Sequence, residues 1–389
     1  MAMNFKLMPC VFLLSMTATV TCMAGDKDHP FPTDVSATPQ WELVLRRYQE
    51  LGEHRSGTEI DHATARWLLS ELEKRGVDAK LQTWPLNVFH LRKSELRIGS
   101  ENFHNFPFWY PRATGPTGIH APLVLSNSGE DDAMAGSIAL VRAPSSQFEF
   151  HFDVAPVLQQ VADKGAQAAV VILNHPMGAV SAQNTNRPWH QRELPIPALI
   201  ASEAEAGALL LLAANKSDTT LLIDGQTRPG EAMNVLAKID RNSDRWLVIS
   251  TPVSGWFEVT NERGPGIAMW IQLTEWLTDM ELDTNVLFVA LSGHELSGMG
   301  MQALVDSAEL PRPDSVDLWL HLGSGIAVQT PLLSAVSSSH ELADLVKQTL
   351  TACTALEYWP EEKTPSGSEQ YAALQLGYPV VGLSLIHIS

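Results

Sequence analysis

Short apolar runs alternate with amphipathic segments along most of this chain. Apolar residues at helical spacing predict helices over residues 41–51, 63–75, 154–163, 202–212, 266–278 and 339–355. Continuous or alternating apolar runs predict strands over residues 77–84, 136–142, 168–173, 234–239, 246–250, 285–291, 317–322 and 379–385. Because strands alternate with helices, we expect an α/β fold with a mostly parallel, mixed sheet sandwiched by helices.

Composition limits the size of the fold and the kind of partner. The chain has 389 residues, of which 45% are hydrophobic, so it can bury a large core and is long enough for two domains. Its 26 Lys and Arg against 44 Asp and Glu give a net charge of −18. Phosphate binding needs clustered basic residues, so this charge argues against a nucleic-acid partner.

The first residues have the pattern of an export signal. Lys6 precedes a mostly apolar stretch over residues 7–20, and Ala24 closes a small-residue cleavage pattern. The stretch is too short to span a bilayer, so we expect a signal peptide over residues 1–24 and a periplasmic or secreted protein. A lipoprotein site at Cys22 fits less well, because a threonine precedes that cysteine. Cys353 is then the only cysteine of the mature chain, which excludes an internal disulfide.

Unusual polar residues stand where the predicted strands end. Ser254 follows one strand, His294 and Glu295 follow the next, and His321 lies near the end of a third, while Glu262 begins a helix. Ligands of open α/β sheets bind at the carboxyl ends of the strands, so these residues are candidates for one site.

Three motifs carry a resemblance to a known family. They read STPVSGW at 250–256, ERGPG at 262–266 and HELSG at 294–298. Their order resembles the di-zinc aminopeptidase and glutamate carboxypeptidase-like exopeptidases, whose relatives include glutaminyl cyclases. That family reads roughly Gly-Ala-His-x-Asp-Ser-Trp, Asp-Asn-x-Ser-Gly and Glu-Glu-x-Gly. The resemblance implies a zinc-exopeptidase-like fold for most of the mature chain.

The same resemblance implies that the metal site is altered. Pro252 occupies the place of the first histidine ligand, and Glu262 that of the bridging aspartate. His294 replaces the glutamate base, Glu295 keeps the next ligand place, and His321 replaces a ligand aspartate. A standard two-zinc site needs more carboxylate and imidazole ligands than these, so we do not expect one.

Three functional interpretations stay open. The chain could bind a peptide or small amide without catalysis, as an interaction module. It could hold one zinc ion through Glu262, Glu295 and His321, with His294 acting on water. It could use His294 and a carboxylate for metal-free acid–base chemistry. In each case Ser254, Trp256, Glu369 and Gln370 are the candidate substrate-binding residues, although Glu369 and Gln370 also suit a plain polar loop.

The middle of the chain forms a separate pattern. GSIALVR at 136–142, KGA at 164–166 and LPIPALI at 194–200 occur in the order found in protease-associated domains, which this segment resembles. We therefore expect residues 101–232 to be an inserted α/β domain, with residues 25–100 and 233–389 forming the exopeptidase-like domain. The family's last ligand is a histidine beyond a strand that Gly377-Tyr378-Pro379 matches; His387 stands in that region but sooner than the usual spacing, so the domain could also continue beyond Ser389.

Overall fold

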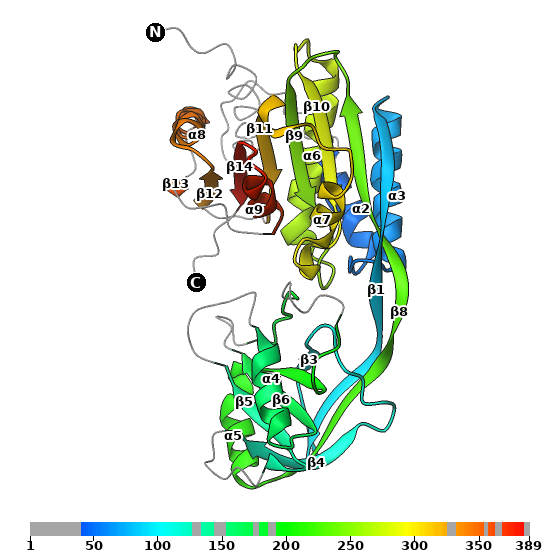
Figure 1. Cartoon of the computed structure of the whole chain (residues 1–389), viewed down its shortest axis with the longest axis vertical. Helices are drawn as coiled ribbons and strands as arrows, with labels where there is room; N and C mark the ends of the chain where they lie inside the picture. The colour runs from blue at the N-terminus through cyan, green and yellow to red at the C-terminus, as the bar shows by residue number, and fades with distance from the viewer. Residues whose placement is uncertain are drawn as a thin grey trace. The chain divides into compact units, whose positions relative to one another are not determined.

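A computed structural model describes residues 40–126, 134–143, 153–173, 179–185, 192–324, 332–353, 357–361 and 368–384. The predicted signal peptide over residues 1–24 lies outside these ranges. The chain divides into two compact units (Figure 1). The first comprises the described residues up to Trp84 and from Glu231, and the second is Pro85–Gly230.

The first unit is built on a mixed sheet. Its strands lie in the order β13 (Glu357–Glu361), β12 (Leu332–Ser337), β14 (Val380–Ser384), β11 (Val316–Leu322), β9 (Trp246–Pro252), β10 (Asn285–Leu291) and β8 (Asp218–Ile239). The central strands β14, β11, β9 and β10 are parallel, while β12 and β8 run antiparallel to their neighbours in this group. The carboxyl ends of β11, β9 and β10 therefore meet at one edge.

Helices cover both faces of this sheet. One face carries α2 (Gln40–Leu51), α3 (Glu59–Lys74), α6 (Thr260–Asp279) and α8 (His340–Cys353), and the other carries α7 (Met299–Val305) and α9 (Ser368–Gln375). Alternate strand residues supply the two cores, as when Ile249 packs with α6 and Val248 with α7. The predicted α/β class with a mixed, helix-covered sheet is confirmed.

The second unit has a smaller sheet of its own. Its elements are the outer parts of β1 (Asp78–Ile98) and β8, then β2 (Glu101–Phe103), β3 (Asn105–Pro107), β4 (Ile119–Leu125), β5 (Ile138–Arg142), α4 (Val154–Asp163), β6 (Ala168–Leu173), β7 (Ala198–Ser202), the 3-10 turn η4 (Glu203–Glu205) and α5 (Ala206–Ala214). Strands β5, β6 and β7 are parallel, and α4 packs on them.

The boundary between the units differs from the expected one. Residues 85–100 belong to the second unit, because β1 is a continuous strand that leaves the first unit at Trp84 and pairs with β2 beyond it. Val88 and Phe89 lie so close to Gly230 and Gly225 that a Cβ at either glycine would come within 2.8 Å of them. These contacts hold the outer half of β1 to β8.

Helix α6 begins earlier than predicted and contains Pro265. The missing N–H of this proline affects only the second turn, next to donors that are unpaired within any helix. Its neighbour Gly266 has no room for a side chain, since a Cβ would lie 2.8 Å from Thr251 Oγ1 and 3.1 Å from the Leu322 carbonyl. The start of α6 is thus in close contact with the ends of β9 and β11.

Helix α3 also begins earlier than predicted, at Glu59. The Thr58 side chain accepts a hydrogen bond from the Asp61 N–H, which caps the helix and fixes its first turn. Among the helices that lie in the described ranges, none is long and apolar enough to cross a membrane.

Candidate functional site

A tight turn at the end of β10 presents His294 and Glu295. Gly293 has a φ of 88°, which glycine adopts without strain, and the 3-10 turn η5 (His294–Leu296) follows it. The N–H groups of Gly293 and His294 both donate to Ser254 Oγ, at 2.9 and 3.2 Å. The turn is therefore joined to the loop after β9.

The carboxylate of Glu295 is buried, and each of its oxygens accepts a hydrogen bond from within the protein. One oxygen accepts the Ser56 N–H at 2.7 Å, and the other accepts the Ser254 hydroxyl at 2.7 Å. Ser254 is itself fully buried and accepts two backbone N–H groups, so it supports the turn, and its predicted contact with a substrate stays a prediction.

A second buried carboxylate, Asp61 on α3, lies at the end of a serine chain. The Gly293 N–H donates to Ser56 Oγ, which bonds to Ser292 Oγ at 2.9 Å. The Ser292 hydroxyl donates to Asp61 at 2.8 Å, and the Gly57 N–H donates to its other oxygen at 2.8 Å. Burial raises the pKa of Asp61 to about 7 despite these bonds.

His294 forms a pair with Glu369 of α9. Its Nδ1 lies 3.0 Å from both carboxylate oxygens. The His294 side chain is 21% exposed, whereas Glu369 is buried. Burial alone would raise the pKa of Glu369, but the charge and hydrogen bond of His294 hold it well below its usual range. The buried carboxylate thus orients an imidazole that reaches the surface.

His321 is buried and neutral near pH 7. Burial lowers its pKa to about 4, although the charge of Glu369 opposes this shift. The Trp319 indole N–H donates to Ser250 Oγ at 2.7 Å, and Ser250 Oγ lies 2.9 Å from His321 Nδ1. Since an indole only donates, the Ser250 hydroxyl can give its proton to Nδ1, which satisfies both side chains.

Glu262 pairs with the residue that follows it. Its Oε1 lies 2.7 Å from Arg263 Nη2, and the Ser324 hydroxyl donates to the same oxygen at 3.4 Å. The Glu262 side chain is 42% exposed, whereas Arg263 is almost fully buried. Glu262 lies at the strand ends as expected, but with a guanidinium beside it.

These pairings do not fit a metal site as they stand. In the described ranges, no three His, Cys, Asp or Glu side chains are grouped so that they could hold a metal ion. Glu295 has both oxygens engaged by internal donors, Glu262 faces a cation, and His321 Nδ1 is bonded to Ser250. The ligand roles of Glu262, Glu295 and His321 stay predictions that this donor set does not support.

The residues that the structure brings together differ from the set that the sequence motifs predicted. The charges of His294 and Glu369 act on the pKa of His321, and those of His294 and His321 act on the pKa of Glu369, so the three side chains come together on the α9 side of the sheet. Trp256 is buried in the loop after β9, and Gln370 lies against Gly382 of β14. The substrate-binding roles of Trp256, Glu369 and Gln370 stay predictions.

Sequence reasoning missed several buried partners, namely Ser56, Asp61, Ser250, Arg263 and Ser292. Arg263 was visible within the ERGPG motif, where a cation in the first turn of a helix is unusual. The serines carried no comparable signal, because their roles depend on contacts between segments far apart in the chain.

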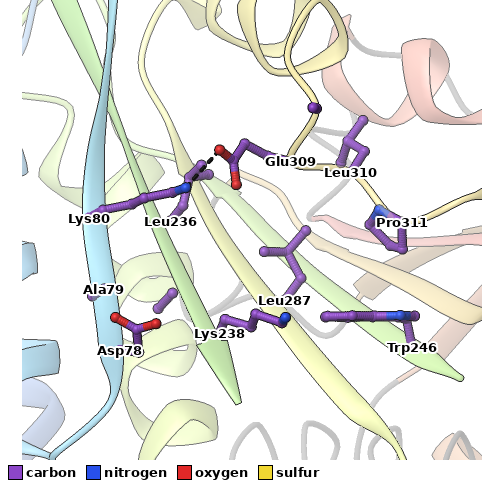
Figure 2. Close-up of a pocket in the computed structure, with 12 residues that line it drawn as sticks. Asp78, Ala79, Lys80, Leu236, Lys238, Trp246, Leu287, Glu309, Leu310 and Pro311 are labelled. Carbon is purple, nitrogen blue, oxygen red and sulfur yellow. Dashed lines mark hydrogen bonds and ion pairs between the residues drawn. The ribbon is translucent and has the colours of Figure 1, made fainter. Parts of the chain in front are cut away.

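A separate pocket opens on the α7 face of the sheet (Figure 2). It has a volume of about 330 Å³, with Leu236 and Leu287 among its apolar lining residues and Trp246 at one side. Lys80 crosses its rim to Glu309 at 2.6 Å, and the Lys238 ammonium lies 5.0 Å from the Trp246 ring centre. Trp246 is the first residue of β9, so this pocket lies away from the carboxyl ends that carry His294.

Asp61→Asn is expected to change how stability depends on pH. The folded-state pKa of Asp61, about 7, lies above its unfolded value, so this group makes the wild type lose stability as pH rises from about 4 to 7. The loss approaches ~4 kcal/mol for a shift of about three pH units. The Asp61→Asn variant cannot ionise at this position, so this loss of stability disappears. The Ser292 hydroxyl can turn to accept a hydrogen bond from the new amide. Urea denaturation between pH 4 and 8 measures the difference.

Two buried histidines change the pH dependence of stability in the opposite direction. His54 and His321 have folded pKa values of about 4, below their unfolded value, so they add stability as pH rises to about 6.5. We therefore expect the stability of Asp61→Asn to rise steadily over this range. Glu59→Gln, at an exposed position of the same helix, is the control and should follow the wild type. Parallel curves for Asp61→Asn and wild type would show that Asp61 is ionised normally.

No family model and no curated protein sequence matches this chain. Several solved structures do resemble it. A zinc aminopeptidase from Bacillus subtilis has a TM-score of 0.72 at 15% identity, covering 89% of this chain and 84% of its own. An aminopeptidase from Aneurinibacillus sp. strain AM-1 has a TM-score of 0.68 at 16% identity, covering 96% and 88%.

A peptidase M28 precursor from Shewanella amazonensis is equally similar, with a TM-score of 0.69 at 16% identity over 96% of this chain and 86% of its own. Identity at this level shows the fold and not the chemistry of the site. The chain therefore has the α/β fold of these aminopeptidases.

Proposed function

We propose that this protein binds peptides or small amides at the carboxyl ends of β9, β10 and β11, and does not cleave them with a two-zinc mechanism. The observation that supports this most directly is the pairing of Glu295, whose two oxygens take the Ser56 N–H and the Ser254 hydroxyl at 2.7 Å each. A metal ligated by Glu295 would share these oxygens with both donors, and a catalytic metal also needs further ligands, which are not grouped around it in the described ranges.

Two exposed groups suit such a ligand. The His294 imidazole is fixed by Glu369 through Nδ1, which leaves Nε2 as the ring nitrogen available to an amide. Phe257, in the loop after β9, is 45% exposed and offers an apolar contact. Ser254 joins this loop to the His294 backbone, so both elements are held in place before a ligand arrives. The likeness to aminopeptidases favours a peptide over other amides.

Peptide binding and hydrolysis are measured on the same purified protein. A tripeptide amide with a free amino end is expected to bind with an affinity that neither added Zn²⁺ nor EDTA changes. Leucine p-nitroanilide should not be hydrolysed above background. His294→Gln should weaken peptide binding by about ten- to a hundredfold, because a hydrogen bond to a charged or polarised group contributes about 1.5–3 kcal/mol. Calorimetric titration gives the affinities.

The chain offers a matched control for this variant. His104 in the second unit also pairs with a carboxylate, Glu205 at 3.1 Å, but its side chain is exposed. His104→Gln should bind the peptide as tightly as wild type. Zinc-dependent hydrolysis at a typical turnover of about 10 s⁻¹ would reject the proposal.

The His294–Glu369 pair favours a second function, metal-independent acid–base hydrolysis. A carboxylate that fixes an imidazole is the arrangement by which general bases are positioned in many enzymes. Hydrolysis that resists EDTA and is lost in His294→Gln would establish this function in place of silent binding.

We propose further that the protein is exported and that its second unit is a protease-associated insert. The signal-like residues 1–24 support export. The β5–α4–β6 pattern, in which GSIALVR and KGA fall at the predicted places, supports the insert. N-terminal sequencing of protein recovered from outside the cytoplasm should begin at Gly25, the residue after the predicted cleavage site.

A further inference from the structure

Arg263 is an unusual residue for its position. It is the fourth residue of α6, where the positive end of the helix dipole disfavours a cation. It is also buried, with 2% of its side chain exposed. A buried guanidinium is stable only if charged or polar partners satisfy it, so its contacts indicate what it does.

Its nitrogens reach three separate segments. Nε donates to the Ser254 carbonyl at 3.0 Å, and Nη1 donates to Ser324 Oγ at 2.9 Å. Nη2 pairs with Glu262 Oε1 at 2.7 Å. Ser254 follows β9, Ser324 follows β11, and Glu262 begins α6, so one side chain joins the two strand ends to the helix.

The charge of Arg263 also reaches the opposite side of the site. It lowers the pKa of Glu369, and it helps to keep His321 neutral. Glu262 and Glu369 thus receive positive charge from the same guanidinium, Glu262 directly and Glu369 at longer range. Without it, Glu262 would lose its paired cation, and Glu369 would lose one of the positive charges that act on it.

The backbone is shaped to bring Arg263 there. Gly264 lies so near Leu45 of α2 that a Cβ would meet its Cδ2 at 2.4 Å, and a Cβ at Gly266 would lie 2.8 Å from Thr251 Oγ1. Gly264 thus lets α6 approach α2 closely, and Gly266 lets it approach the ends of β9 and β11, on either side of Arg263. The placement of the guanidinium is therefore a built feature of the fold.

We propose that the Arg263 guanidinium is an internal cation that takes the place of a metal ion at these strand ends. It supplies the positive charge and the multiple contacts with which an ion would join carboxylates and backbone there. Solved structures of the same fold include a protein described as a zinc aminopeptidase, whereas in the described part of this chain no three donor side chains are grouped to hold a metal. The proposal concerns stability and metal response, and it stands whether or not a peptide binds.

The test is the melting temperature of the full chain, measured with EDTA and then with ZnCl₂. Wild type is expected to melt at the same temperature in both. Arg263→Met should melt about 5–10 °C lower in EDTA, because it leaves Glu262 without its cation. Zn²⁺ should then restore at least half of this loss, since the Glu262 carboxylate that Arg263 pairs with is freed to bind it.

Two further variants make every outcome informative. Arg263→Lys keeps the charge but not the three separate contacts, so it should melt between wild type and Arg263→Met and ignore Zn²⁺. Arg245 directly precedes β9, at the end opposite to the site, and pairs with Asp317 of β11. Arg245→Met breaks this Arg–carboxylate pair and should show no recovery with Zn²⁺.

Three results would overturn the proposal. They are an equal Zn²⁺ response in wild type, a destabilised Arg263→Met that Zn²⁺ does not rescue, and an Arg263→Lys as unstable as the methionine variant. If Arg263→Met does not fold, the lysine variant and wild type decide the question alone. Because no peptide is added, these melting temperatures are independent of whether the protein binds peptides.

Discussion

Gly300→Ala is expected to lower the free energy of unfolding by about 3 kcal/mol, the upper end of the usual cost of overpacking. Gly300 is the second residue of α7, and a Cβ there would lie 2.0 Å from the Ser292 carbonyl oxygen and 2.6 Å from Asn234 Oδ1. Even close C–H···O contacts keep about 3.3 Å. Helix propensity alone would favour alanine by about 1 kcal/mol, so the steric term decides the sign.

The neighbouring groups cannot easily move away. The Asn234 amide donates to the Gly300 carbonyl at 2.9 Å, and its Oδ1 accepts the Ser292 N–H at 3.1 Å. The Trp84 indole also donates to Asn234 Oδ1. Circular dichroism during urea denaturation measures the effect. Gly207→Ala, in α5 with no atom within 4 Å of the new Cβ, is the control and should be neutral or slightly stabilising. Equal stability of the two variants would mean that the turn before His294 is loosely packed.

The sequence predicted the regular elements well where apolar periodicity was strong. The helix at 154–163 and the strands at 168–173 and 285–291 were found with the limits that α4, β6 and β10 have. The helix buries one face and both strands are buried at every position, so hydrophobic pattern and structure coincide. The limits of α6 were missed because Pro265 reads locally as a helix start.

The boundary between the units was missed for a different reason. The pattern at 77–84 ends at Trp84 and Pro85, and a proline usually marks the end of a strand. Strand β1 nevertheless continues to Ile98, because its outer half pairs with β2 and β8. Pairing partners so far away in the chain are not visible in a local pattern.

The sequence placed the candidate residues on the elements that carry them but did not indicate their pairings. Motif positions placed His294 and Glu295 after β10 and Glu262 at α6, where they lie. The pairing of His294 with Glu369 depends on how α9 packs on the sheet, 75 positions farther along the chain. The role of Arg263 follows from its burial, which a motif does not report. Chemistry at such a site depends on partners, so residue types alone left three interpretations open.

Trp319→Ala is expected to cost about 4 kcal/mol of unfolding free energy, within the range for emptying a buried tryptophan site. Trp319 is fully buried in β11 and packs edge-on against Tyr378, with ring centres 5.0 Å apart. Its indole donates to Ser250 Oγ, which also contacts His321. The change therefore leaves a cavity and removes the donor that fixes the Ser250 hydroxyl.

Trp319→Phe separates the cavity from the hydrogen bond. Phenylalanine keeps most of the apolar volume, so it should cost about 1–2 kcal/mol, largely for the lost bond to Ser250. Trp41→Ala, at a position 45% exposed on α2, is the control and should change stability by less than about 0.5 kcal/mol. Urea denaturation followed by circular dichroism gives all three values. If Trp319→Phe lost as much stability as Trp319→Ala, the indole hydrogen bond would outweigh the packing of β11 against α9. The Ser250–His321 pair would then be the main reason for a tryptophan at this position.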